Sequence, residues 1–168
     1  MDAGVTVGMG EIRVVRGPTK GASSVLVGLG LGSCIGICAF DRAAGVAGMA
    51  HVVLPECRSE RDRSPGKYAD SAVPALVEAM VQAGAARSRM RVAIVGGAQL
   101  FAGQGPSALN IGPRNTKAVI QAIGQSGLVL CAQDVGGSAG RTVYLSSQDG
   151  SVSVRTLGAA ERRLVVLA

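Results

Sequence analysis

The sequence predicts an α/β protein in which a mixed β-sheet sandwich carries two main helices. Short segments with the composition of β-strands outnumber helical segments by roughly three to one. Only two segments repeat apolar residues at the i, i+3, i+4 spacing of an amphipathic helix. The chain of 168 residues shows no internal repeat and no linker, so residues 1–168 are expected to form a single domain with its own core.

The composition narrows the class of partner. Hydrophobic residues make up 48% of the chain, but Trp is absent and Phe and Tyr number two each, so the core must be mainly aliphatic. Few aromatic side chains are available to stack on bases, and we therefore expect no nucleic-acid partner. The formal charge of +6 favours an acidic partner through long-range attraction.

The four cysteines are expected to be free thiols. The first residues lack the basic and apolar regions of a secretory signal, which predicts a reducing, cytoplasmic location. The apolar runs are too short to span a bilayer, so no direct membrane insertion is expected.

The first half of the chain predicts four strands, two of which form a hairpin. The predicted strands are residues 11–15, 24–29, 35–40 and 46–54. The last two flank a short segment that contains Asp41 and Gly45, which is the signature of a hairpin. Residues 56–66 are polar and charged, and we expect them to form an exposed loop.

The length of the hairpin loop decides how Cys34 and His51 lie relative to each other. A two-residue loop of Arg42 and Ala43 places them directly opposite each other. A four-residue loop that extends to Gly45 places them diagonally on the same face, whereas a three-residue loop places them on opposite faces. Arg-Ala is a poor sequence for a two-residue turn, so we expect the four-residue loop.

Two amphipathic helices are predicted in the second half. The first begins near Lys67 with Asp70 as its N-cap and ends at Gly84. Pro74 is compatible with this helix only near its first turn. The second helix has Asn115 as its N-cap. Its inner face is expected to consist of Val119, Ile120 and Ile123.

The remaining segments alternate between strands and turns. Strands are predicted at residues 90–95, 127–132, 141–146, 151–156 and 164–167. Asp149 and Gly150 join two of them into a second hairpin. The Gly96-Gly97 pair predicts a turn at which the backbone approaches another group closely. Residues 101–109 are rich in Gly and Pro and are expected to form a loop.

A glycine-rich stretch leads to the candidate nucleophile. Gly28, Gly30 and Gly32 alternate before Ser33 and Cys34, and they leave the cysteine with little side-chain cover. Glycine backbone N–H groups are also suitable donors for an oxyanion. Most cysteines of a reduced protein are buried and inert, but such a cysteine needs no backbone freedom around it.

His51 is the only histidine in the chain. A thiol needs a base or a cation nearby to react near neutral pH, so Cys34 and His51 form the natural catalytic pair. The alternative for a lone histidine is a hydrogen-bonded residue of a strand. Cys38, Cys57 and Cys131 have no comparable context. The sequence fits neither a zinc site nor a nucleotide-binding loop, so neither cofactor is expected.

Six motifs occur in order over nearly the whole chain. They are GLGSC at 30–34, AHVVLP at 50–55, GKYAD at 66–70, GGA at 96–98, NIGPRN at 110–115 and DVGG at 134–137. In this order and spacing they resemble the CheD family of chemoreceptor glutamine deamidases. The resemblance implies an α/β sandwich related to bacterial toxin deamidases. It also implies a cytoplasmic enzyme that hydrolyses selected glutamines of methyl-accepting chemotaxis receptors to glutamates, without a cofactor, and so tunes chemotaxis.

The resemblance also assigns roles to individual residues. It implies that Cys34 is the nucleophile and that His51 is its base, in agreement with the pairing reached from the residues alone. Ser33 and Gly32 are candidates to support the oxyanion through their backbone.

One position departs from the family pattern. CheD proteins usually have a threonine six residues before the cysteine, where it orients the histidine, and Gly28 stands at this position here. Ser33, Ser24 and Ser23 are the candidates to take over the task.

Two other functions stay open at this point. One is a non-catalytic regulator that binds chemoreceptors and a CheC-type phosphatase, the partner that the resemblance adds to the receptors. The other is a general cysteine amidohydrolase or transglutaminase that acts on a different substrate.

Overall fold

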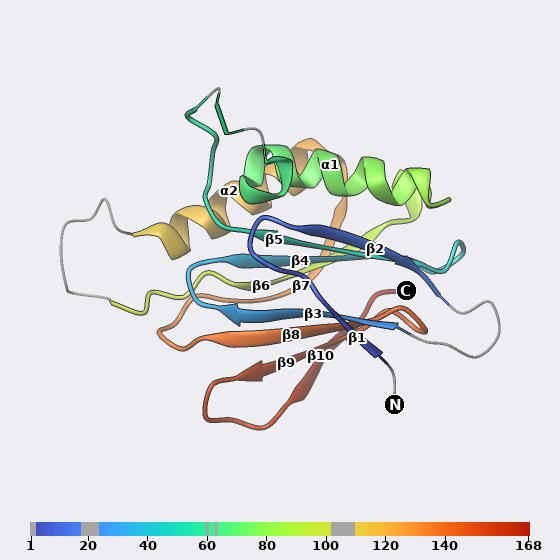
Figure 1. Cartoon of the computed structure of the whole chain (residues 1–168). Coiled ribbons are helices and arrows are strands. Elements are labelled where there is room, and N and C mark those ends of the chain that lie inside the picture. Colours follow the sequence, from blue (N-terminus) through green and yellow to red (C-terminus); the bar gives the residue numbers. More distant parts are fainter. Residues whose placement is uncertain (1–2, 18–23, 60, 63, 102–109) are drawn as a thin grey trace.

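A computed structural model describes residues 3–17, 24–59, 61–62, 64–101 and 110–168. In this part of the chain two helices lie over one of two stacked β-sheets (Figure 1). The helices are α1 (Ala69–Gln82) and α2 (Ile111–Gln125). The strands are β1 (Ala3–Thr6), β2 (Ile12–Arg16), β3 (Ser24–Leu31), β4 (Ile35–Asp41), β5 (Val46–Val52), β6 (Arg91–Gly96), β7 (Val129–Val135), β8 (Arg141–Ser146), β9 (Ser151–Thr156) and β10 (Arg162–Val166). Two short 3-10 helices span Pro65–Lys67 and Arg87–Arg89.

Both sheets have five strands and mixed pairing. The first has the order β1-β3-β8-β9-β10, and the second has the order β2-β5-β4-β6-β7. The pairs β1–β3 and β6–β7 are parallel, and the other neighbours are antiparallel. The expected mixed sandwich with two main helices is therefore confirmed. Strand β1 was not predicted, because AGVT is too short and too rich in small residues to stand out.

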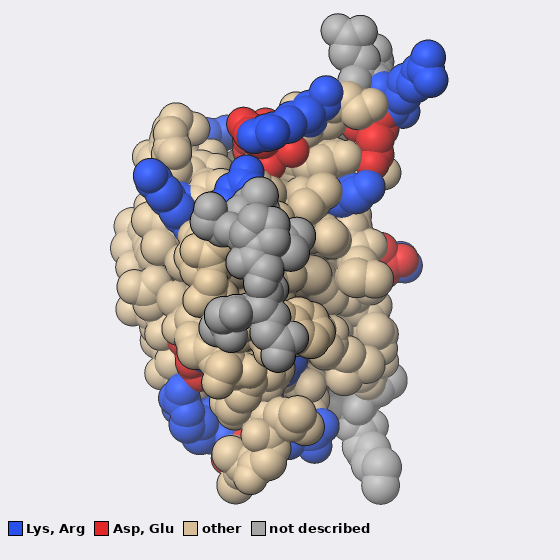
Figure 2. Space-filling view, turned by 90° about the vertical axis from the view of Figure 1, so that its left-hand side faces the viewer, with Lys and Arg blue, Asp and Glu red and all other residues tan. Residues whose placement is uncertain are grey.

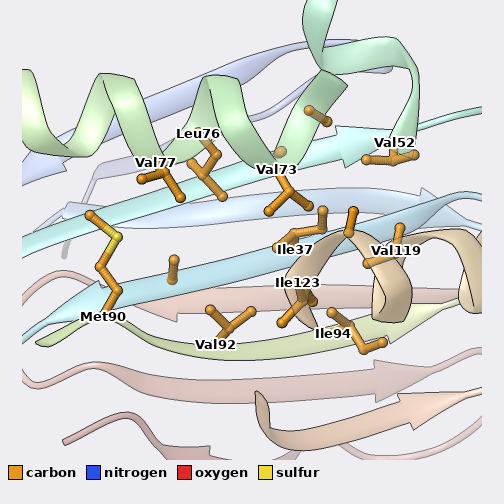
Figure 3. Packing of buried hydrophobic residues seen from close by; sticks show 14 of the residues in the cluster. Ile37, Val52, Val73, Leu76, Val77, Met90, Val92, Ile94, Val119 and Ile123 are labelled. Carbon is orange, nitrogen blue, oxygen red and sulfur yellow. The ribbon is translucent and has the colours of Figure 1, made fainter. Parts of the chain in front are cut away.

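The second sheet is the middle layer of the molecule. One of its faces packs against the helices, where Val73, Leu76 and Val77 of α1 and Ile123 of α2 lie over the strands (Figure 3). Its other face packs against the first sheet through a second apolar cluster that includes Phe40. Strands β4 and β5 are consequently buried at every position. Neither helix of the described chain is long and apolar enough to cross a membrane.

The β4–β5 hairpin has the four-residue turn that the sequence predicted. Asp41 pairs with Val46, and the ladder continues to Ile35 opposite Val52. Asp41 is fully buried, accepts the N–H groups of Ala44 at 3.2 Å and Ala86 at 2.8 Å, and forms an ion pair with Arg89. The carboxylate therefore fixes the turn and also ties it to the segment that leads from α1 to β6.

Both helices begin earlier than the sequence predicted. Tyr68, not Asp70, occupies the N-cap position of α1, so Pro74 lies beyond the first turn. Pro74 and Asp70 are both exposed, and water can therefore take the carbonyl that the missing N–H of Pro74 leaves free.

The start of α2 differs from the prediction by more residues, and it also lies earlier in the chain. Asn110, not Asn115, stands at its N-cap position, and Pro113 falls in the first turn, where a helix needs no N–H from that residue. With this start, Ile120 is 38% exposed and does not belong to the inner face, whereas Val119 and Ile123 are buried as expected. Asn115 is left inside the helix, on its buried side.

Burial of the Cys38 thiol should make the protein less stable as the pH rises into the alkaline range. Burial raises the pKa of Cys38 to about 12, so in alkali the unfolded chain releases a proton that the native protein retains. The free energy of unfolding should fall from the ordinary thiol pKa of 9.0 up to about 12, and it should fall less steeply in Cys38→Ala. Denaturant titrations at a series of pH values measure the slopes. Replacement of the exposed Cys131 by alanine is the control, and equal slopes for Cys38→Ala and wild type would contradict the prediction.

Candidate active site

Cys34 and His51 lie at one end of the sandwich, where β3 ends, β4 begins and β5 ends. Gly36 pairs with His51, so continuing the register by two residues places Cys34 diagonally across from His51 on the same face. This face is the one that packs toward the first sheet, because Cys38 and Met49 of the same rows belong to the cluster between the sheets. Cys34 is 9% exposed and His51 is 3% exposed. The hairpin register is therefore the one for which the diagonal arrangement was predicted.

The turn before Cys34 is held in place by backbone contacts. Gly97 donates its N–H to the carbonyl of Cys34 at 2.9 Å, and Ala98 donates to Gly32 at 2.8 Å. Gly96 has a φ of +123°, and a Cβ atom there would lie 2.1 Å from the carbonyl oxygen of Cys34. The close approach predicted for the Gly96-Gly97 turn is thus an approach to the backbone of Cys34 itself.

Asn115 connects the segments that carry the two side chains. It is fully buried in α2, and its Nδ2 group donates to the carbonyl oxygens of Ser33 and Val53, both at 2.9 Å. Ser33 directly precedes Cys34, and Val53 lies two residues after His51. One amide group therefore ties the nucleophile turn to the end of β5, so Asn115 is a buried bridge, and the N-cap role predicted for it is wrong.

The ring of His51 is oriented by a backbone carbonyl. His51 Nδ1 lies 3.0 Å from the oxygen of Val7, and a carbonyl accepts hydrogen bonds only, so Nδ1 carries the proton. Nε2 of His51 is buried and has no hydrogen-bond partner among the described residues. With the proton held on Nδ1, the lone pair of the neutral tautomer lies on Nε2, which is the atom that a general base uses.

The group that orients His51 differs from the expected one. Nδ1 of His51 is bound to Val7 and Nε2 has no partner, so neither Ser24 nor Ser33 contacts a ring nitrogen among the described residues, and Ser23 lies outside them. A Cβ atom at Gly28 would approach Val143 to 3.0 Å, within the apolar packing between the sheets. The sequence offered no signal for the carbonyl of Val7, since any residue supplies a carbonyl.

Burial sets the protonation state of the candidate nucleophile. It raises the pKa of the Cys34 thiol, because a thiolate loses hydration in the partly enclosed site. The resting cysteine is therefore a neutral thiol that needs a base to remove its proton. Of the other cysteines, Cys38 is enclosed in the core, and Cys57 and Cys131 are exposed.

Some large apolar side chains near Cys34, in sequence or in space, are exposed to solvent. Leu29, Leu100 and Phe101 are 50%, 48% and 74% exposed. A Cβ atom at Gly32 would lie 2.8 Å from Leu100, which places this leucine beside the turn that carries Cys34. Figure 2 shows the corresponding end of the molecule, with Lys and Arg side chains along its upper and lower margins.

Comparisons with known proteins show the family to which the chain belongs. Residues 53–156 match the family model for CheD, described as chemotactic sensory transduction. The chain belongs to the CheD family. A probable chemoreceptor glutamine deamidase CheD of Symbiobacterium thermophilum is 44% identical over 162 residues, which are 94% of this chain and 95% of that protein. The chemoreceptor glutamine deamidase CheD of Thermotoga maritima is 41% identical over 156 residues, which are 93% and 94% of the two chains.

All six segments through which the sequence resembles CheD meet around Cys34 and His51. Backbone hydrogen bonds join residues 96–98 to the nucleophile turn, and they also join Gly136 and Gly137 to residues 96–99. Val53 and Leu54, which follow His51, both donate to the carbonyl of Lys67. Asn115 supplies the contact from the remaining segment. The CheD motifs are therefore largely the parts that hold this end of the sandwich together.

Loss of the Asn115 bridge should affect both stability and function. Asn115→Ala leaves two carbonyl oxygens without their donor, which should lower the free energy of unfolding by roughly 1–3 kcal/mol. Denaturant unfolding measures this loss, and thiol reactivity of Cys34 reports the changed turn. Gln121→Ala, on the exposed side of the same helix, is the matched control and should be neutral. Equal stability of the two variants would contradict the bridging role.

The raised pKa of Cys34 predicts how its reactivity changes with pH. Alkylation requires the thiolate, so the rate at Cys34 should still be rising at pH values above the ordinary thiol pKa of 9.0. Iodoacetamide labelling followed by peptide mass spectrometry separates Cys34 from the other three thiols. A rate that levels off below this pH would indicate a preformed thiolate and would contradict the prediction.

Proposed function

We propose that the protein hydrolyses the side-chain amide of selected glutamines on chemoreceptors, with Cys34 as nucleophile and His51 as general base. One observation carries the proposal above all others. His51 is held through Nδ1, its Nε2 atom has no partner in the described structure, and the strand register continued to position 34 brings Cys34 to the same face. The family relationship supports the choice of substrate, because the relatives are named chemoreceptor glutamine deamidases.

The first half of the reaction forms a thioester. His51 Nε2 takes the proton of the Cys34 thiol as Sγ attacks the carboxamide carbon of the glutamine. The tetrahedral intermediate then collapses, the C–N bond breaks, and the nitrogen leaves as ammonia with the proton that His51 returns. The glutamyl group stays bound to Sγ of Cys34.

The second half releases glutamate. Neutral His51 takes a proton from water as the water oxygen attacks the thioester carbon. The C–S bond breaks, and Cys34 recovers its proton from the imidazolium. One water is consumed and one ammonia is released for each glutamine, and these steps need no cofactor.

The backbone around Cys34 offers donors for the oxyanion. The N–H of Gly32 already donates to the carbonyl of Gly30 at 3.0 Å. Within the described chain, the N–H groups of Ser33 and Cys34 have no backbone acceptor. We assign the oxyanion to these two groups, with Gly32 supporting the turn that aims them.

The surroundings of Cys34 favour a protein substrate over a small molecule. Leu100, beside the turn that carries Cys34, and the exposed Leu29 and Phe101 offer apolar surface of the kind that contacts a helix or a second protein. Deamidation replaces a neutral amide by a carboxylate, so each turnover changes the charge of the receptor by one unit and thereby tunes chemotaxis. The receptor segments that the protein reaches and the protein itself are then both cytoplasmic.

Intact-mass analysis of a receptor cytoplasmic fragment tests the proposal. Incubation with the wild-type protein should add about one mass unit for each deamidated glutamine, as expected for acyl transfer to water. Cys34→Ala should abolish this gain, because it removes the nucleophile. Cys131→Ala, at an exposed thiol remote from the site in sequence, should retain the activity.

A second function is the regulator that binds receptors and a CheC-type phosphatase without catalysis. The observation in its favour is Gly28, which cannot supply the side-chain hydroxyl usual at this position. An unchanged receptor mass with both wild type and Cys34→Ala, together with retained binding of the fragment by both, would establish this function and exclude the deamidase.

A further inference from the structure

The peptide group between Val7 and Gly8 lies between His51 and a carboxylate. Its carbonyl oxygen accepts the hydrogen bond from His51 Nδ1 at 3.0 Å. Its N–H group donates to Oε2 of Glu11 at 2.9 Å. The two atoms belong to one planar amide, and resonance couples them. A continuous chain of hydrogen bonds therefore runs from the Glu11 carboxylate, through one peptide, to the imidazole.

Strand pairing fixes both ends of this chain. Ile12 pairs with Ala50, so Glu11 stands opposite His51 at the end of the β2–β5 ladder. The His51 N–H donates to the carbonyl of Glu11 at 3.0 Å, and Gly10 donates to the carbonyl of His51 at 2.8 Å. The segment between β1 and β2 consequently binds the backbone of His51 by hydrogen bonds, and the same segment supplies the carbonyl that binds the ring.

The carboxylate at the end of the chain is ionised. The N–H of Gly8 and the nearby Arg13 lower the pKa of Glu11 below its ordinary value. Arg13 is an exposed partner at 3.4 Å, and the Glu11 side chain is itself 44% exposed, so water weakens the direct field of the carboxylate. Hydrogen bonds to an ionised group are stronger than neutral ones, and linked hydrogen bonds polarise one another. The hydrogen-bonded peptide thus carries the effect of the Glu11 charge to the His51 ring, although solvent screens the direct interaction.

We infer that Glu11 is a positioning residue of the deamidase, acting through the Val7–Gly8 peptide to hold His51 with Nε2 free and to stabilise the imidazolium formed when Cys34 loses its proton. The inference rests on the proposed function. It describes a carboxylate–histidine pair with one peptide inserted between its members, whereas the Ser-His-Asp arrangement places the carboxylate directly on the ring.

Charge and geometry can be separated by substitution at Glu11. Glu11→Gln keeps an oxygen that can accept from Gly8 but removes the charge, and it should lower kcat about tenfold with KM unchanged. Glu11→Ala removes both and should lower kcat further. Arg13→Gln breaks the exposed ion pair but leaves the peptide link intact, so it is the matched control and should retain the wild-type kcat.

NMR of the protein alone provides a measurement that needs no receptor. The Nδ1–H proton of His51 and the amide proton of Gly8 should both move upfield in Glu11→Gln, because both hydrogen bonds weaken. Neither should move in Arg13→Gln. A role for Glu11 limited to folding would leave these two resonances in place in a stable variant.

The two measurements distinguish failure of the inference from failure of the proposed function. If wild type deamidates the receptor fragment and Glu11→Gln matches it in kcat with both resonances unmoved, the role of Glu11 is overturned and the deamidase stands. If wild type produces no deamidation, the proposed function and the catalytic role of Glu11 are both overturned, and the resonances then report only the hydrogen-bond chain.

Discussion

The antiparallel ladder between β4 and β5 fixes the register that places Cys34 and His51 on one face of the sheet. Both strands are buried on both faces, so the alternation of apolar and polar residues that normally specifies register is absent here. The turn between the two strands must specify the register instead. The buried carboxylate of Asp41 does so by binding the backbone of Ala44 within the turn and that of Ala86 outside it.

Around this ladder, the two candidate catalytic side chains are held by separate structures. The nucleophile turn rests on the backbone of Gly97 and Ala98, and the imidazole is held by the turn between β1 and β2. Asn115 joins the two parts through a single buried amide. This division explains how a site at the end of a sandwich, where loops meet, keeps a defined geometry: each loop is tied to a strand or a helix close to the atom that it positions.

Much of this arrangement could be predicted from the sequence, and the exceptions share a physical cause. The strand pattern, the four-residue turn and the register of the hairpin follow from side-chain periodicity and turn chemistry. The start of α2 did not follow, because Asn115 has the residue type of an N-cap but serves as a buried donor. The carbonyl of Val7 could not be predicted at all, since it belongs to a short, inconspicuous strand end that only the tertiary fold brings to His51.

The contact between Val7 and His51 explains how the histidine is oriented although position 28 is a glycine. A histidine oriented by a side-chain hydroxyl depends on the identity of one residue, whereas a histidine oriented by a main-chain oxygen depends only on the path of the backbone. Substitutions that preserve this path leave the orienting group in place, whichever side chains they introduce. The orientation of the histidine therefore tolerates changes of side chain at the orienting position. A search for active family members that requires a hydroxyl-bearing residue at position 28 would miss this protein.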